Sequence, residues 1–121
     1  MSEEIQRKDK YMLQETITKI ETSVKETPVL DNEQKKELLN LISTLKTEVS
    51  ELSKTHPEQT QSITGFAGVS IHEAIREEKN PQLLKLSLQG LSTSVEGFES
   101  SHPKLVGIIN SLCLTLSNIG I

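Results

Sequence analysis

The stretch L-K-T-E-V-S-E-L-S-K-T-H-P (Leu45 to Pro57) returns 46 residues later as L-S-T-S-V-E-G-F-E-S-S-H-P (Leu91 to Pro103), with five of thirteen positions identical. In each copy an apolar pattern of helical spacing is followed by a hydroxyl residue and His-Pro. A residue before proline avoids helical geometry, whereas proline is well suited to the first position of a helix. We therefore expect two helical corners and a duplicated helical hairpin. The alternative is a chance similarity between two helices of like composition.

Apolar residues around this repeat are spaced by alternating steps of four and three, which places them on one face of a helix. A good start signal precedes one segment, where Asp31 and Gln34 have the spacing of a capping box. Another segment follows Asn80-Pro81, an N-cap residue with proline at the first helical position. The stripes are Leu13, Ile17, Ile20 and Val24; Leu38, Ile42, Leu45, Val49 and Leu52; Leu84, Leu88, Leu91, Val95 and Phe98; and Leu105, Ile109, Leu112, Leu116 and Ile119.

The segment from Pro57 to Lys79 is less regular, because G-F-A-G at Gly65 to Gly68 interrupts it. Two glycines cost about 1 kcal/mol each relative to alanine in a helix. Close packing of a neighbouring helix or a kink would explain them, and helix, kink or loop all remain open. A phosphate-binding loop is disfavoured, because no strand precedes the segment and no Lys-Ser or Lys-Thr follows.

These patterns predict an all-α protein, an antiparallel bundle of four or five short helices. We expect a single helical domain over 1–121, with an N-terminal helix and linker at 1–30, a first hairpin at 31–79 and a second hairpin at 80–121. The chain has 121 residues, 34% of them hydrophobic. That content indicates a thin core, as in elongated helices or in a chain that completes its core with a partner.

Charge excludes one class of partner and divides the chain. With 13 Lys and Arg against 17 Asp and Glu, the chain lacks the basic surface that nucleic-acid binding requires. After residue 79 there are only four charged side chains, Lys85, Glu96, Glu99 and Lys104. Four charges cannot solvate two helices. The last two helices are therefore expected to lie in the middle of the bundle or to form the surface where subunits meet.

Candidate residues for chemistry are few, and each has a structural explanation. The spacing of His56, His72 and His102 lacks a zinc-binding pattern, and two of them belong to the corners. Cys113 has no charged residue within eight positions, so we interpret it as a small buried hydrophobe. Glu73, Glu77 and Glu78 form a charge run that is typical of a solvated helix end. We therefore predict no catalytic residue, no cofactor and no metal, and hence no enzyme.

The end of the chain resembles a known family. F-E-S-S-H-P-K-L (Phe98 to Leu105), followed by L-S-N-I-G-I (Leu116 to Ile121), is similar to an uncharacterised bacterial family of short helical proteins, a domain of unknown function. Its members end in F-E-x-S-H-P and N-x-G-I. The specific part of the resemblance covers Leu88 to Ile121. It implies a bacterial source and helical hairpins, and it supplies no activity, cofactor or catalytic residue.

The resulting functional hypothesis is a non-enzymatic interaction or scaffold protein that self-associates through its poorly charged C-terminal half, with an unidentified protein partner as a further option. A single cysteine and an N-terminus without an apolar signal core favour the cytoplasm. The uncharged run Leu105 to Ile121 is too short and too polar for a transmembrane span. A peripheral membrane role for this segment is the alternative, but membrane-surface helices normally carry Lys and Arg on their polar face.

Overall fold

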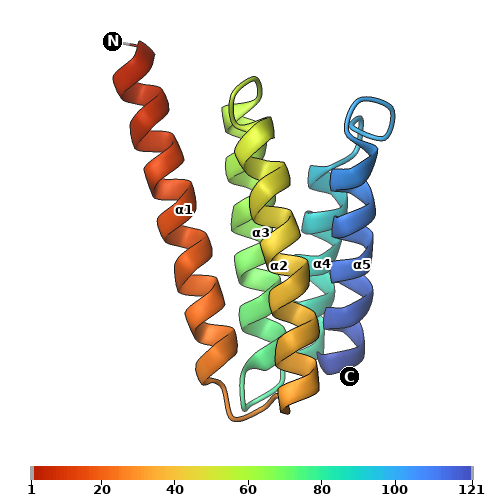
Figure 1. Cartoon of the computed structure of the whole chain (residues 1–121). Coiled ribbons are helices and arrows are strands. Elements are labelled where there is room, and N and C mark those ends of the chain that lie inside the picture. The colour runs from red at the N-terminus through yellow and green to blue at the C-terminus, as the bar shows by residue number, and fades with distance from the viewer. Residues whose placement is uncertain (1, 121) are drawn as a thin grey trace.

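The computed structural model describes residues 2–120, with side chains from residue 11 onward, as five α-helices and no strand. The helices are α1 (Ser2–Glu26), α2 (Asn32–Leu52), α3 (Pro57–Ile75), α4 (Pro81–Ser94) and α5 (Pro103–Gly120). They run alternately down and up, so that consecutive helices are antiparallel (Figure 1). This confirms the all-α bundle with a duplicated hairpin, α2–α3 and α4–α5, and an extra N-terminal helix.

The helix boundaries follow the local signals. The Asp31 carboxylate accepts a hydrogen bond from the Gln34 backbone N–H (2.8 Å), and the Gln34 side chain accepts one from the Asp31 N–H (3.0 Å). The capping box is therefore confirmed, and it satisfies two of the donors that a helix start leaves unpaired. The Asn80 side chain similarly accepts from the Leu83 N–H at 3.1 Å. Pro57, the proline of the first corner, begins α3, and the other repeat starts its helix in the same way.

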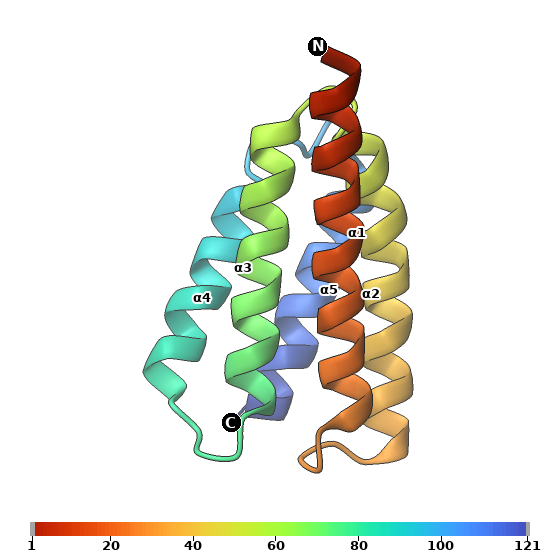
Figure 2. The same ribbon diagram turned by 90° about the vertical axis from the view of Figure 1, so that its left-hand side faces the viewer.

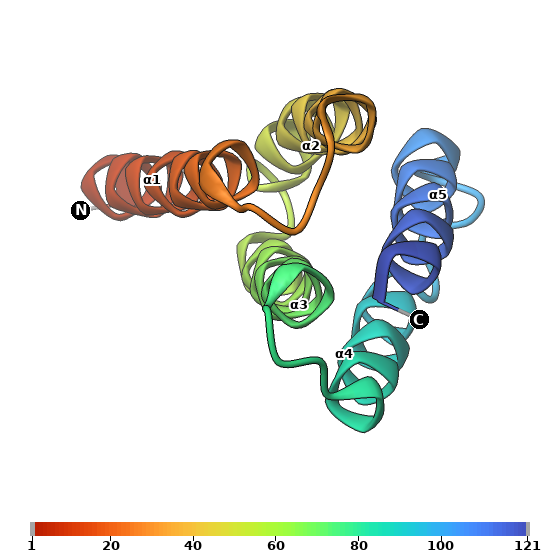
Figure 3. The same ribbon diagram turned by 90° about the horizontal axis from the view of Figure 1, so that it is seen from below.

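Helices α2 to α5 surround a common core, and α1 lies outside this group (Figures 2 and 3). Among the described residues, α1 contacts α2 and α3 but neither α4 nor α5, whereas α3 and α5 meet across the middle of the bundle. α1 therefore covers one hairpin and leaves the other uncovered. The core is built by the predicted stripes together with the inner side of α3. Its fully buried side chains include Val24, Leu38, Leu52, Ile63, Leu91, Leu105, Ile109, Leu112 and Leu116.

One predicted boundary is wrong. The stripe Leu84 to Phe98 predicts a single helix, but α4 ends at Ser94 and the chain turns before the second corner. Gly97 adopts a positive φ of 95°, which is favourable for glycine because it lacks a Cβ. Phe98 still reaches the core from this turn. Spacing alone cannot distinguish a helix from a turn that returns an apolar residue to the same face.

The G-F-A-G segment is helical, since α3 continues through it without a break. A Cβ added at Gly68 would lie 3.4 Å from Ile20 Cδ1 of α1, which is an ordinary contact, so α1 lies beside this glycine without approaching closely enough to require it. Gly65 faces open space. Among the described helices, none is long and apolar enough to cross a membrane.

Candidate interaction surface

The two His-Pro corners meet at one end of the bundle. The rings of His56, Phe98 and His102 form a triangle in which each ring contacts the other two edge to face. Their centroids are 5.3 Å (His56 and Phe98), 5.5 Å (Phe98 and His102) and 6.1 Å apart (His56 and His102). Edge-to-face contact is an arrangement that aromatic rings prefer, because the positive edge of one ring meets the negative face of the other. The corners thus form a small aromatic cluster that holds the hairpins together.

Each corner uses the same hydrogen bonds. The backbone N–H of His56 donates to the Leu52 carbonyl, and that of His102 donates to the Phe98 carbonyl, both at 2.8 Å. Each imidazole Nδ1 is paired with the hydroxyl of the residue before it, at 2.8 Å and 2.9 Å. The repeat of sequence is therefore also a repeat of geometry. Two of the three candidate histidines serve the corners in this way.

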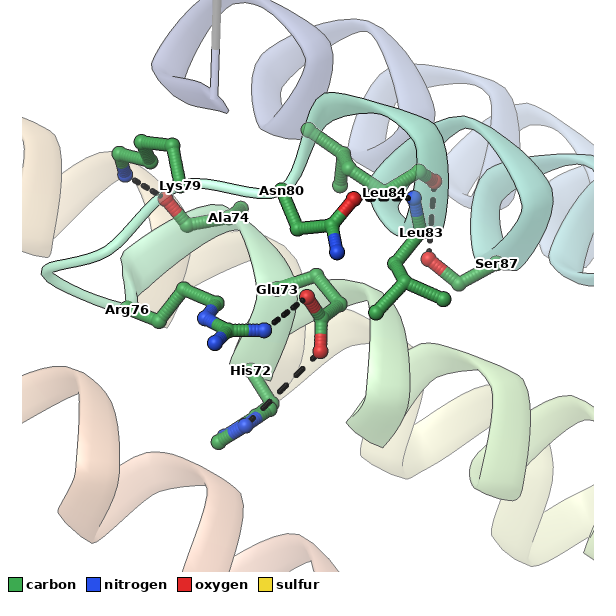
Figure 4. A network of polar contacts seen from close by, with 9 residues as sticks. All are labelled: His72, Glu73, Ala74, Arg76, Lys79, Asn80, Leu83, Leu84 and Ser87. Carbon is green, nitrogen blue, oxygen red and sulfur yellow. Dashed lines mark hydrogen bonds and ion pairs between the residues drawn. The ribbon is translucent and has the colours of Figure 1, made fainter.

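The third histidine lies apart from the other two. His72 is exposed near the end of α3, with its Nε2 atom 3.9 Å from the carboxylate of Glu73 (Figure 4). That carboxylate is buried and pairs with the Arg76 guanidinium at 2.9 Å. Glu77 and Glu78 point into solvent in the following loop. The three candidate carboxylates therefore do not gather at one place.

Backbone carbonyls at the end of α3 accept hydrogen bonds from side chains of two loops. The Lys79 ammonium donates to the Ala74 carbonyl, and burial lowers the pKa of this lysine (Figure 4). The Thr27 hydroxyl, from the loop after α1, donates to the Ile75 carbonyl at 3.3 Å. Cations near the last carbonyls of a helix also favour its dipole. Among the side chains that the structure describes, no three or more His, Cys, Asp or Glu residues are placed to hold a metal ion.

The strongest surface feature is the line of contact between α3 and α4, which we name the α3–α4 seam. A Cβ added at Gly90 would overlap the Phe66 ring, so this glycine lets the ring rest directly on α4. Leu83 and Leu86 precede Gly90 on the same side of α4, at helical spacing, and Val69 follows Phe66 on α3. These four apolar side chains are 41–56% exposed.

The duplication offers a direct comparison with the α2–α5 seam, which occupies the equivalent place. Subtracting or adding 46 relates Leu83 to Glu37, Leu86 to Asn40, and Val69 to Thr115. At the α2–α5 seam the Thr115 hydroxyl donates to the Glu37 carboxylate at 3.4 Å, and Lys104 pairs with Glu48 at 3.7 Å. One seam is therefore polar and the other is apolar, although both face outward.

Periodicity alone did not predict the exposed residues of the α3–α4 seam, because they lie outside the buried stripes. The repeat does contain a signal for this surface. At positions beside the buried stripe, the first copy has the polar residues Glu37 and Asn40, whereas the second copy has Leu83 and Leu86. The shortage of charge also extends further back than expected. Neither the stretch from Gln59 to Ile71 nor that from Leu86 to Val95 contains a charged residue.

A second feature is an apolar groove between α4 and α5, on the other side of α4. Its volume is about 500 Å³, and Lys85 is the only charged residue that lines it. Cys113 lines the groove from α5, and it is half-buried instead of buried as the sequence predicts. Burial raises the pKa of its thiol, because the thiolate is poorly solvated there.

The comparisons with known proteins bear on the family alone. No curated protein and no solved structure shows significant similarity to the chain. The family model of the domain of unknown function DUF4404 matches residues 38–121, which covers most of α2 and all of α3, α4 and α5. The helix α1 lies outside the matched residues. Because this match spans more than half of the 121 residues and includes both corners, the chain belongs to the family of the domain of unknown function DUF4404.

Proposed function

We propose that this chain is a non-enzymatic helical interaction protein that associates with a second copy through the α3–α4 seam. Helix α4, from the poorly charged C-terminal half, lies at the centre of the proposed interface, and α3 extends this interface on one side. The observation that carries the proposal is the contrast between the seams. Equivalent positions are Glu37, Asn40 and Thr115 on one seam and Leu83, Leu86 and Val69 on the other.

The physical reason is the cost of exposed apolar surface. Removing apolar area from water contributes roughly 25 cal/mol per Å², so adjoining leucine, valine and phenylalanine side chains favour contact with a similar surface. Desolvation of charge would oppose such contact, and this seam is uncharged over Gln59 to Ile71 and Leu86 to Val95. A two-fold arrangement would place the same surface on both copies, as in most homodimers.

A peripheral membrane role for α5 has less support from the structure. Its apolar stripe faces the bundle core, and Leu105, Ile109, Leu112 and Leu116 are all fully buried. Lipid contact by this stripe would require α5 to leave the bundle. On the outer side of α5, Leu114 is the large apolar residue that is exposed.

Light scattering after size-exclusion chromatography tests the proposal. The expected result is a dimer of the 13.5 kDa chain at micromolar concentration. Leu86→Glu should weaken dimerisation by at least about tenfold, because a central interface position would then bury an unpaired charge. Asn40→Glu adds the same charge at the equivalent position of the other seam, and it should leave the dimer unchanged. A compact wild-type monomer at all concentrations would contradict the proposal.

A further inference from the structure

The groove between α4 and α5 is the counterpart of the groove that α1 fills. Two observations mark the side of α2 that faces α1. The Lys35 ammonium donates to the Lys25 carbonyl at 2.8 Å, and Ser53, just after α2, lines a crevice together with Met12 and Leu13 of α1. Residues 39, 42 and 46 lie between Lys35 and Ser53 on the same side of α2.

The repeat relates these positions to the empty groove. Adding 46 to residues 35, 39, 42 and 46 gives 81, 85, 88 and 92, and all four of these α4 residues line the α4–α5 groove. On the partner helices, Ile71 faces α1, and its equivalent on α5 is Ser117, which also lines the groove. The fold thus has two grooves at corresponding places of the repeat, and among the described helices only the first groove is covered by a helix (Figure 3).

The filled groove shows what kind of segment fits. α1 is an amphipathic helix whose stripe runs from Leu13 to Val24, about 17 Å along the helix axis. The 14 residues of α4 offer about 21 Å, which accommodates such a stripe. The groove wall is apolar where Leu84 and Leu88 contribute to it. Because α4 and α5 contact each other more extensively than α2 and α3 do, an occupant would rest in the groove instead of separating the helices.

Charge indicates one further property of the occupant. Lys85 stands where α2 has Leu39, and it is the only charge in the groove. In the filled groove, the contact between Lys25 and Lys35 sets an antiparallel register that brings Glu21 level with position 39. A helix bound to α4 in the same register would face Lys85 with the residue equivalent to Glu21, and an acidic residue at that position complements the charge of Lys85.

We propose that the α4–α5 groove binds an amphipathic helix of a partner protein, with an aliphatic stripe like that of α1 and an acidic residue that pairs with Lys85. The bound helix lies antiparallel to α4. This site lies on the side of α4 away from the α3–α4 seam, so the proposal goes beyond self-association and does not depend on it.

Cys113, the only cysteine of the chain, provides a reporter inside the groove. The experiment measures the rate of its alkylation by iodoacetamide at mildly alkaline pH, in the full chain carrying Leu86→Glu so that self-association through the seam does not interfere. The probe is a synthetic peptide of residues 11–27, which carries the α1 stripe. The expected result is a saturable fall in rate of at least about tenfold, because a bound helix covers the thiol. A peptide with Ile17→Glu should give no protection.

A charge exchange tests the predicted register. Lys85→Glu in the chain should raise the peptide concentration needed for half-protection about two- to fivefold, which is the range of an exposed ion pair. A peptide with Glu21→Lys should restore the affinity that Lys85→Glu removes. Lys104→Glu, on the opposite side of α5, should leave the concentration for half-protection unchanged. Unchanged alkylation at millimolar peptide would overturn the proposal. Protection that rises with chain concentration alone would also overturn it, because the occupant would then be a second copy.

Discussion

The two seams of the bundle occupy equivalent places in a duplicated fold, yet their surfaces differ in polarity. At the α2–α5 seam, Glu37 and Thr115 are joined by a hydrogen bond and face water. At the α3–α4 seam, Leu83 and Val69 occupy the same positions and are about half exposed. Core stripes and corners are repeated, whereas the seams are not. The difference shows which part of the repeat serves folding and which part is available for contact with another molecule.

The two grooves differ in the same way. The α2–α3 groove is covered by α1, and a Cβ added at Gly68 would be in van der Waals contact with Ile20 of α1. The α4–α5 groove remains open and is lined by Leu84, Leu88 and Cys113. The second hairpin therefore exposes apolar surface on both sides of α4. This concentration of exposed apolar surface around one short helix makes α4 the centre of both proposals.

The largest expected effect tests whether the two hairpins share one core. Ile63 in α3 and Ile109 in α5 are equivalent and fully buried. Ile63→Ala and Ile109→Ala should each lower the free energy of unfolding by about 2–5 kcal/mol, because each removes buried methyl groups and leaves a cavity. Urea denaturation measures both. If the free energy of unfolding falls by less than about 1 kcal/mol at only one of the two sites, the hairpins do not contribute equally to one core.

A smaller effect is expected at the contact between α3 and α4. Gly90→Ala should destabilise the chain by about 1–3 kcal/mol, because the new methyl group would overlap the Phe66 ring. In a chain with Phe66→Ala the same change should instead stabilise by about 1 kcal/mol, since alanine favours the helix. Gly107→Ala faces open space on α5 and serves as the control, with a similar gain. Equal effects of Gly90→Ala in both backgrounds would show that the ring does not rest on this glycine.

The smallest effect concerns one buried hydroxyl. Ser70 of α3 is fully buried, and its hydroxyl has no hydrogen-bond partner among the described residues, whereas α5 has Leu116 at the equivalent position. Ser70→Ala should raise the free energy of unfolding by about 1 kcal/mol, because it removes an unsatisfied polar group. Thermal unfolding followed by circular dichroism measures the change. Destabilisation would indicate that the hydroxyl has a partner in solution.

Much of this fold could be predicted from local signals. Capping at Asp31 and the prolines at 57, 81 and 103 fix where helices begin, since each acts on the backbone next to it. The end of α4 could not be predicted, because Phe98 continues the apolar spacing through a turn that depends on the positive φ of Gly97. The spacing of apolar residues carries no information about that change of backbone direction.

The candidate surface was predictable only in outline. The scarcity of charge after residue 79 drew attention to the second hairpin, but it did not show which side of α4 is exposed. The exposure of a side chain depends on how the helices are arranged in space. Helix α1 covers α2 and α3 and does not contact α4. The contact of Phe66 with Gly90 likewise joins two helices that the sequence pattern treats separately.

The most direct test of the central claim makes the apolar seam a copy of the polar one. The triple variant Val69→Thr, Leu83→Glu and Leu86→Asn gives the α3–α4 seam the residues of its counterpart, and sedimentation equilibrium then measures its mass beside that of the wild type. We predict a dimer for the wild type and a helical monomer of about 13.5 kDa for the variant. A variant that still dimerises as strongly as the wild type, or a wild type that is itself monomeric, would contradict the account.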